Sequence, residues 1–266
     1  MKHFVSIGLL LAFASAVMPQ KTPHTMMAVI AHADDEAFIG PLLAHYARQG
    51  VKIYLVIMTQ GNTGRPRVSH GIPNGPELAR ARAEEARCCC RELGVEPPLI
   101  LQFDDDQLGK AARPPWDYIG RAEREIRRLF AEVRPEVVLS FGPEGVYGHP
   151  DHQLTGDVVS QVVQSGTDGA PRQLLYFGFP KNRLSSWHGQ EPISGVDASY
   201  LTVRVPYSKD DFAVFQKSFK CYKTQFPPEE METIPKQLDE VWGGRIYLRP
   251  WFGMVSGDDL FTLKGQ

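Results

Sequence analysis

The sequence lacks the signals of several protein classes. Its 29 lysines and arginines against 31 aspartates and glutamates leave a net charge of −2, so no basic field favours nucleic acid or an anionic membrane surface as a partner. Only four cysteines are present, and none has the CxxC spacing of zinc ribbons or thioredoxin-like motifs. No apolar run beyond the N-terminus approaches the roughly 20 residues that span a bilayer. We therefore expect a small-molecule partner.

The N-terminus has the pattern of an export signal. A weakly basic start is followed by the apolar run Phe4–Phe13, and Ala14–Ala16 is a small-residue cleavage pattern. An uncleaved membrane anchor is the alternative, but Phe4–Met18 has only 15 residues, fewer than the roughly 20 needed to cross a bilayer. We predict a signal peptide over residues 1–16 and an exported protein without a transmembrane segment.

The remaining chain, 17–266, has the composition of one globular domain. Hydrophobic residues make up 42% and charged residues 23%, and 24 glycines and 21 prolines are spread without a period. We find no internal repeat, low-complexity tract or linker that would divide it. A single domain of this length buries a sizeable core without needing staples.

Strand and helix patterns alternate over most of the chain. Apolar runs typical of buried strands lie at Met26–Ala31, Val51–Met58, Pro98–Phe103, Pro135–Phe141 and Leu174–Phe179. Helical patterns lie at Ala37–Gln49, Glu77–Leu93, Trp116–Val133 and Pro150–Val163. This alternation predicts an α/β, Rossmann-like fold with a mostly parallel sheet and helices on both faces. The C-terminal third is less regular, with strands expected at Tyr200–Val205 and Arg245–Phe252 and helices at Ser208–Tyr222 and Pro228–Val241.

The cysteines allow several interpretations. Cys88, Cys89 and Cys90 are consecutive within a predicted helix, and Cys221 stands alone. Consecutive helical residues point about 100° apart, so the triplet cannot close around one metal ion. In an exported protein one of the three could pair with Cys221, or all could be small buried residues. The sequence leaves these possibilities open.

Two polar clusters follow predicted strands. The segment His32–Glu36 (HADDE) comes directly after the first strand, and Tyr147–His152 (YGHPDH) follows the strand Pro135–Phe141. Alone, the acidic residues could complement a helix dipole and His32 could be structural. In open α/β sheets, however, ligands bind outside the carboxyl ends of the strands, so both clusters are expected at one edge. Two histidines and a carboxylate with an open fourth position are the ligand set of a catalytic zinc site.

These clusters resemble the two motifs of the PIG-L/LmbE-like family of zinc-dependent N-deacetylases, which act mostly on N-acetylglucosaminyl groups. The first family motif, AHPDDE, is matched by Ala31–Glu36 with Ala33 in place of the proline, and the second, GHPDH, is intact at Gly148–His152. The resemblance extends over Met26–Val163 and weakly to Lys223–Gln225. Ala33 frees a backbone angle that proline would fix, and we expect the change to be tolerated because every ligand and the base remain.

The resemblance implies a metal site and a general base. His32, Asp35 and His152 would hold Zn²⁺, and the fourth position would carry the attacking water. Asp34, next to a ligand but free of the metal, would accept a proton from that water, whose pKa zinc lowers to about 7.

The resemblance also assigns roles to neighbouring residues. His149 and Tyr147 would polarise the amide carbonyl and assist protonation of the leaving amine. Asp151 would orient His149 or one of the ligand histidines through a hydrogen bond. Arg82 and Asp105 match positions that bind sugar hydroxyls or support that pocket, although an arginine on a charged helix often forms only surface pairs.

The sequence therefore predicts an exported zinc-dependent hydrolase that removes the N-acetyl group from an N-acetylglucosamine-type amino sugar or glycoconjugate. A noncatalytic, metal-dependent glycan-binding module is the first alternative, but such a module has no need for a base at Asp34. A zinc amidase acting on a non-sugar amide is the second. A nucleotide-binding protein is disfavoured because no glycine-rich phosphate loop follows the first strand.

The loop Thr59–Pro76, with Arg65 and Arg67, is expected to rim the site.

Overall fold

The computed structural model describes residues 23–64, 68–108, 117–189 and 191–265. The predicted signal peptide and the loop arginines Arg65 and Arg67 lie outside these ranges. Among the described residues, no helix is both long and apolar enough to cross a membrane.

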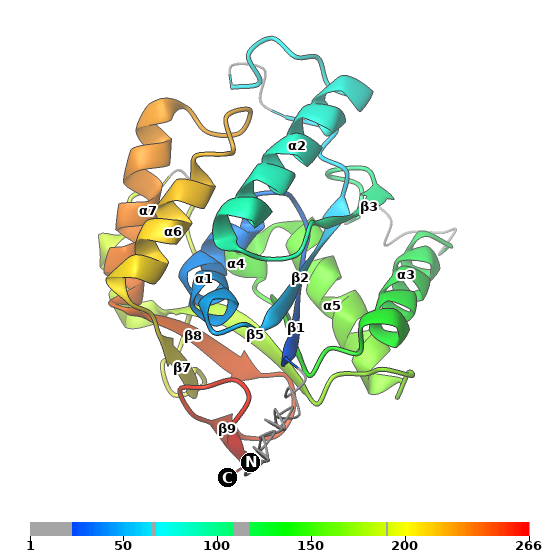
Figure 1. Ribbon diagram of the computed structural model, residues 1–266, viewed down its shortest axis with the longest axis vertical. Helices are drawn as coiled ribbons and strands as arrows, with labels where there is room; N and C mark the ends of the chain where they lie inside the picture. Colours follow the sequence, from blue (N-terminus) through cyan, green and yellow to red (C-terminus); the bar gives the residue numbers. More distant parts are fainter. Residues whose placement is uncertain (1–22, 65–67, 109–116, 190, 266) are drawn as a thin grey trace, which may run out of the picture.

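A twisted sheet with strand order β3-β2-β1-β4-β5-β8-β7 forms the centre of the molecule (Figure 1). Its strands are β1 (Thr25–Ile30), β2 (Lys52–Thr59), β3 (Leu99–Phe103), β4 (Val137–Phe141), β5 (Gln173–Pro180), β7 (Val203–Pro206) and β8 (Arg245–Pro250). β1 to β5 run parallel, whereas β8 pairs antiparallel with both β5 and β7. Short strands β6 (Gly195–Val196), β9 (Val255–Ser256) and β10 (Lys264–Gly265) lie at the periphery. The predicted mostly parallel α/β fold is confirmed, and the less regular C-terminal third supplies the antiparallel edge.

Helices cover both faces of this sheet (Figure 1). One face is covered by α1 (Gly40–Arg48), α2 (Pro76–Leu93), α6 (Lys209–Phe219) and α7 (Pro228–Trp242), and the other by α3 (Asp117–Val133) and α5 (Pro150–Gln164). Shorter helical turns are η1 (Asp35–Ile39), α4 (Gly145–Gly148) and η3 (Lys181–Ser186). Two helix ends carry local capping signals: Gly94 ends α2 in a left-handed conformation, and Ser208 forms a capping box with Asp211.

The central strand β1 shows why the sequence runs are continuously apolar. Ala28 and Ile30 pack into the core on the α1 side, whereas Met27 and Val29 pack into the core on the α5 side. Successive strand residues point to opposite faces, so a strand covered on both faces must be apolar at every position. All four side chains are completely buried.

The strand order places a crevice at the carboxyl ends of β1 and β4. β1 pairs with β2 on one side and with β4 on the other, with Ala28 opposite Leu139. The helices that follow these two strands, α1 and α5, cover opposite faces of the sheet. Such a point of divergence is where ligands bind in open α/β sheets. The loops that carry the two predicted motifs therefore leave the sheet side by side.

A disulfide joins two distant segments on the α2 face. Cys88 in α2 is bonded to Cys221 in the turn after α6, with Cα atoms 5.8 Å apart. Cys89 and Cys90 are free and buried. Of the pairings that the sequence left open, the structure contains the one between Cys88 and Cys221.

Candidate metal and catalytic site

The motif after β1 turns sharply instead of continuing as a strand. Asp34 has a left-handed backbone conformation (φ 109°, ψ −20°), and the 3₁₀ turn η1 begins at the next residue. The carboxylate of Asp35 accepts the backbone N–H of His32 at 2.7 Å. The side chains of Asp34 and Asp35 point in different directions because of this turn, and not because the segment is extended. Asp34 lines the cavity described below, and Asp35 reaches the histidines.

Three side chains bring potential ligand atoms close together. His32 Nδ1 lies 3.2 Å from His152 Nε2, which lies 3.1 Å from Asp35 Oδ1, and Asp35 Oδ2 lies 3.5 Å from His32 Nδ1. Ligands bound tetrahedrally to zinc at about 2.0–2.1 Å are about 3.3 Å from one another. The three predicted ligands therefore have the spacing of a tetrahedral metal site.

The hydrogen bonds of the outer ring nitrogens of His32 and His152 favour a bound cation. His152 Nδ1 is 3.1 Å from the carbonyl oxygen of Gly145, and His32 Nε2 is 3.3 Å from Asp151 Oδ2. Each imidazole therefore donates from its outer nitrogen, and in the neutral ring the inner nitrogen presents a lone pair. Two lone pairs and the Asp35 carboxylate face one another in a buried space. Burial alone would raise the pKa of Asp35, but the adjacent His152 and His32 lower it. This donor set suits a divalent cation such as zinc.

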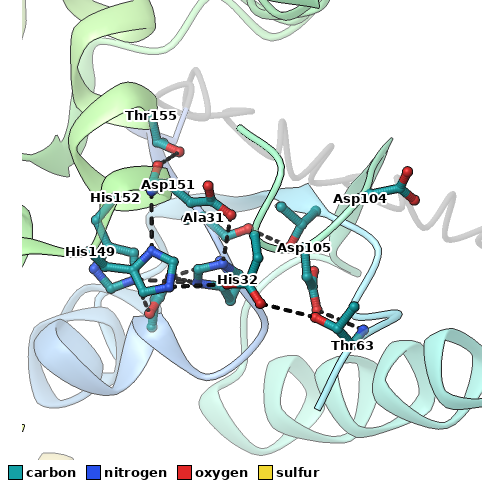
Figure 2. Close-up of polar contacts among 12 residues, drawn as sticks. Ala31, His32, Thr63, Asp104, Asp105, His149, Asp151, His152 and Thr155 are labelled. Atoms are coloured by element: carbon teal, nitrogen blue, oxygen red, sulfur yellow. Dashed lines mark hydrogen bonds and ion pairs between the residues drawn. The ribbon is translucent and has the colours of Figure 1, made fainter. Parts of the chain in front are cut away.

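Asp151 contacts one of the predicted ligand histidines through its side chain. Of the partners that the sequence allowed, namely His149 and the two predicted ligand histidines, the carboxylate takes His32 (Figure 2). The backbone N–H of Asp151, at the start of α5, instead donates to His149 Nδ1 at 3.1 Å. Figure 2 shows the rings of His32, His149 and His152 grouped below Asp151. Asp151 is thus placed to hold the orientation and basicity of His32.

Replacing Asp151 with asparagine is expected to weaken zinc binding about 10- to 100-fold, because a neutral amide supports the His32 ring less well than a carboxylate. Competition with a chromophoric chelator measures the affinity. Asp157→Asn, on the exposed side of the same helix, is the matched control. Unchanged affinity in Asp151→Asn would contradict the assigned hydrogen bond.

His149 presents a proton to the cavity. Because its Nδ1 accepts the Asp151 N–H, the neutral ring carries its proton on Nε2, which lies 3.4 Å from Asp106 Oδ1. Burial, together with the nearby His32 and His152, lowers the pKa of His149 and keeps the ring neutral. His149 also belongs to a group of three histidines, with His32 and His152, whose nitrogens lie within 4.8 Å of one another. The ring could therefore donate a hydrogen bond or approach a metal ion.

Asp34 and Tyr147 face the same space. Burial and the neighbouring carboxylates of Asp35 and Glu36 raise the pKa of Asp34, which favours its action as a base. The Tyr147 ring lies 5.0 Å from the His152 ring, between centroids, and lines the cavity. The position of Tyr147 depends on the left-handed conformation of Val146 (φ 62°) just before it.

Arg82 and Asp105 form a buried ion pair that supports the loop after β2. Arg82 Nη1 lies 3.2 Å from Asp105 Oδ2, and Asp105 also accepts the backbone N–H groups of Gly61 and Thr63. A Cβ on Gly61 would come within 2.7 Å of the Arg82 side chain, so this close approach requires glycine. Arg82 Nε has no hydrogen-bond partner among the described residues. The pair shapes the cavity wall.

A cavity of about 730 Å³ opens over the histidines and extends toward α7. Its near end is polar and is lined by His32, Asp34, Thr63, Asn74, Arg82, Asp105, Asp106, Tyr147 and His149. Its far end, toward α7, combines aromatic and aliphatic side chains (Trp187, Ile193, Phe226, Ile234 and Leu238) with polar ones (His188, Glu191, Glu230, Thr233 and Gln237). The described part of the loop expected to rim the site does so through Thr63, Gly64 and Asn74.

Sequence reasoning did not single out several cavity residues. Asp106 is in a turn where only Asp105 was given a role, and Gln225 is in the segment of weak resemblance. Gln225 donates a hydrogen bond to the carbonyl oxygen of Ala33 and so touches the first motif. Trp187 and Phe226 are in stretches without a local motif, and only the tertiary fold brings them to the site.

Comparisons with known proteins place both motifs in a matching segment. The family described as "GlcNAc-PI de-N-acetylase" matches residues 27–163, from β1 through α5. A 1D-myo-inositol 2-acetamido-2-deoxy-alpha-D-glucopyranoside deacetylase 2 from Catenulispora acidiphila is 34% identical over 157 residues, covering 53% of this chain and about half (52%) of that protein. A 1D-myo-inositol 2-acetamido-2-deoxy-alpha-D-glucopyranoside deacetylase from Thermobispora bispora is 27% identical over 270 residues, covering 89% and 86%. The structure of N,N'-diacetylchitobiose deacetylase from Pyrococcus horikoshii has the same fold, with a TM-score of 0.64 at 18% identity over 86% of this chain and 84% of that one.

Proposed function

The chain belongs to the PIG-L family of deacetylases, hydrolases that cleave amide C–N bonds, and from this premise we propose that it is an exported zinc-dependent enzyme that removes the N-acetyl group from an N-acetylglucosamine-type sugar of a glycoconjugate. The observation that carries the proposal is the convergence of three acceptor atoms, from His32, Asp35 and His152, in the cavity that Asp34 lines. Structural metal sites use four protein ligands, whereas three ligands beside a base are typical of hydrolases.

The residues around these ligands have complementary tasks. A bound zinc ion would polarise the amide carbonyl and lower the pKa of a water molecule. Asp34 takes the proton from the attacking water. His149 donates its Nε2 proton toward the carbonyl oxygen as negative charge develops there, and Tyr147 stands beside it. Asp151 holds His32 in place through the hydrogen bond at 3.3 Å.

The shape of the cavity favours a conjugate over a free monosaccharide. Cavities of about 300–1,000 Å³ accept drug-sized ligands, and this one has about 730 Å³. The polar near end, with Arg82 and Asp105, suits sugar hydroxyls. The far end, with Trp187 and Phe226, suits an apolar or ring-shaped group attached to the sugar.

Two features support export. The N-terminal pattern described above is that of a signal peptide. The Cys88–Cys221 disulfide is typical of oxidising compartments and rare in the cytosol.

The proposal is tested by measuring release of free primary amine from a panel of N-acetylated amino sugars and glycoconjugates with zinc-loaded protein. Release that is absent in Asp34→Asn supports the deacetylase, and the ranking of substrates identifies the sugar. No release from any member, with zinc bound stoichiometrically, would favour a non-sugar amidase or a glycan-recognition module.

Replacing Trp187 with alanine is expected to raise the KM for alkyl or aryl glycosides of N-acetylglucosamine about 10-fold, because an aromatic contact and its buried area contribute about 1.4 kcal/mol. The KM for free N-acetylglucosamine is expected to stay within about 2-fold, because a lone sugar does not reach the indole. Phe252→Ala, at an aromatic residue that is 79% exposed, is the control. Equal changes for both substrate types would contradict a far-end subsite.

A further inference from the structure

Glu36 is the acidic residue of the first motif that the catalytic scheme leaves without a task. Its side chain is almost completely buried, with 2% exposure. One carboxylate oxygen accepts the backbone N–H of Asp34 at 3.2 Å, and the other accepts the thiol of Cys89 at 3.1 Å. A buried carboxylate is retained only where such partners hold it. The partner on one side is the backbone of the proposed base.

Asp34 needs this support because of its backbone conformation. A φ of 109° is unfavourable for a residue with a Cβ and persists only where the surroundings enforce it. The bond from the Asp34 N–H to Glu36 and the bond from the Ala37 N–H to the Asp34 carbonyl, at 3.0 Å, hold the peptide on both sides. Without the first bond, the residue can relax toward an ordinary conformation and its carboxylate then moves.

Cys89, a hydrogen-bond partner of Glu36, and Tyr222, its neighbour, both follow cysteines of the disulfide. Cys89 follows Cys88 in α2, and Tyr222 follows Cys221 after α6, so the disulfide joins the residues directly before them. The buried Tyr222 hydroxyl is near the Glu36 carboxylate and the Cys89 thiol, but it forms no hydrogen bond among the described residues. The helix α2, which carries Cys88, and the helix α6, which precedes Cys221, contact each other (Figure 1).

The same turn touches the first motif at a second point. Thr224 donates to the Glu85 carboxylate of α2 from its backbone N–H at 2.8 Å and from its hydroxyl at 2.7 Å. The Gln225 amide donates to the carbonyl of Ala33, the residue that precedes Asp34. The turn 221–225 is thus bound to α2 by a disulfide and by hydrogen bonds, and it contacts the motif through Gln225.

We propose that Glu36 is a positioning residue for Asp34, and that Cys89 and the Cys88–Cys221 disulfide keep Glu36 in place. The inference rests on the proposed role of Asp34 as the base. It predicts that weakening this assembly slows the chemical step while leaving zinc and substrate binding intact. The restored N–H at Ala33, where the family motif has proline, makes such external support more important.

The first test compares Glu36→Ala with Glu36→Gln. Glu36→Ala is expected to lower kcat about 100-fold, the effect of a displacement of about 1 Å in a catalytic group, with KM and zinc stoichiometry unchanged. Glu36→Gln keeps an oxygen for the Asp34 N–H and is expected to restore kcat to within about 3-fold of the wild-type value. Equal losses in both variants, or zinc loss parallel to the kcat loss, would overturn the proposal.

The second test addresses the assembly behind Glu36. Cys89→Ala and the double variant Cys88→Ser/Cys221→Ser are each expected to lower kcat without raising KM. Cys90→Ala is the matched control, since Cys90 is buried on the same helix and its thiol makes no bond to Glu36 among those that the structure shows. A wild-type kcat in both Cys89→Ala and the double variant would overturn the proposed role of Cys89 and the disulfide.

Hydrogen exchange separates this proposal from the proposed function. Faster exchange of the peptide covering His32–Phe38 in Glu36→Ala, with unchanged exchange in β1, would support Glu36 as a positioning residue for Asp34. This result does not depend on finding a substrate. Unchanged exchange overturns that role of Glu36. Wild-type protein that hydrolyses none of the amides tested would refute the proposed function alone.

Discussion

Asp34→Asn is expected to lower kcat by about 10²- to 10⁴-fold while the protein keeps its zinc, because the change removes the proton acceptor but none of the three atoms that converge on the metal position. The asparagine side chain has nearly the same shape, and the left-handed backbone of Asp34 is tolerated better by asparagine than by most residues. The effect should therefore fall on the chemical step. Steady-state kinetics with a metal determination on the same sample measures both quantities.

Two controls make this result specific. Asp157→Asn, an exposed carboxylate on α5, should leave kcat unchanged. Asp35→Asn, one residue from Asp34, should instead lose zinc, because its carboxylate lies 3.1 Å from His152 Nε2. If Asp34→Asn retained full activity, the base would have to be another cavity residue and the proposed mechanism would be wrong.

Much of the fold was predictable because its signals are local. The continuous apolar run of β1 requires a strand covered on both faces, and Gly94 and Ser208 mark helix ends by their own chemistry. The alternation of strands and helices then gives a parallel sheet, since crossovers are right-handed and sequential elements pack together. The edge strand β7 and its neighbour β8 carry weaker local patterns, and the antiparallel pairing of β8 with β5 and with β7 depends on a tertiary arrangement that no short window encodes.

In the candidate site, too, the residues in local motifs were predictable and those that depend on the tertiary structure were not. The proposed ligand set was predicted from two motifs at neighbouring strand ends, and the structure brings those residues together. The partner of Asp151 was left open because the choice between His32 and His149 depends on where α5 starts relative to β1. Trp187 and Gln225 were not identified because the chain reaches the cavity at these points only after long excursions. The pairing of Cys88 instead of Cys89 was likewise open, since neighbouring helical positions differ only in direction.

Removing His152 is expected to abolish zinc binding and to lower activity by at least about 10³-fold. The metal would supply several kcal/mol of transition-state stabilisation, and each 1.36 kcal/mol is about a factor of ten. His152 is completely buried, and its Nε2 is the atom nearest to both other proposed ligands. His152→Ala should purify with little zinc, while chelated wild-type protein should regain activity on adding zinc. The exposed His70→Ala is the control.

His149→Ala decides between the two possible ligand groups. If His32, Asp35 and His152 bind the metal, His149→Ala keeps zinc and loses turnover, because only a hydrogen-bond donor to the carbonyl has been removed. If the three histidines bind it, His149→Ala loses zinc while Asp35→Asn keeps it. The geometry favours the first outcome, because the His149 Nδ1 is occupied by the Asp151 N–H and its Nε2 faces Asp106 at 3.4 Å. A neutral ring held in that way is an oxyanion donor, whereas His32 Nδ1 and His152 Nε2 face each other and the Asp35 carboxylate.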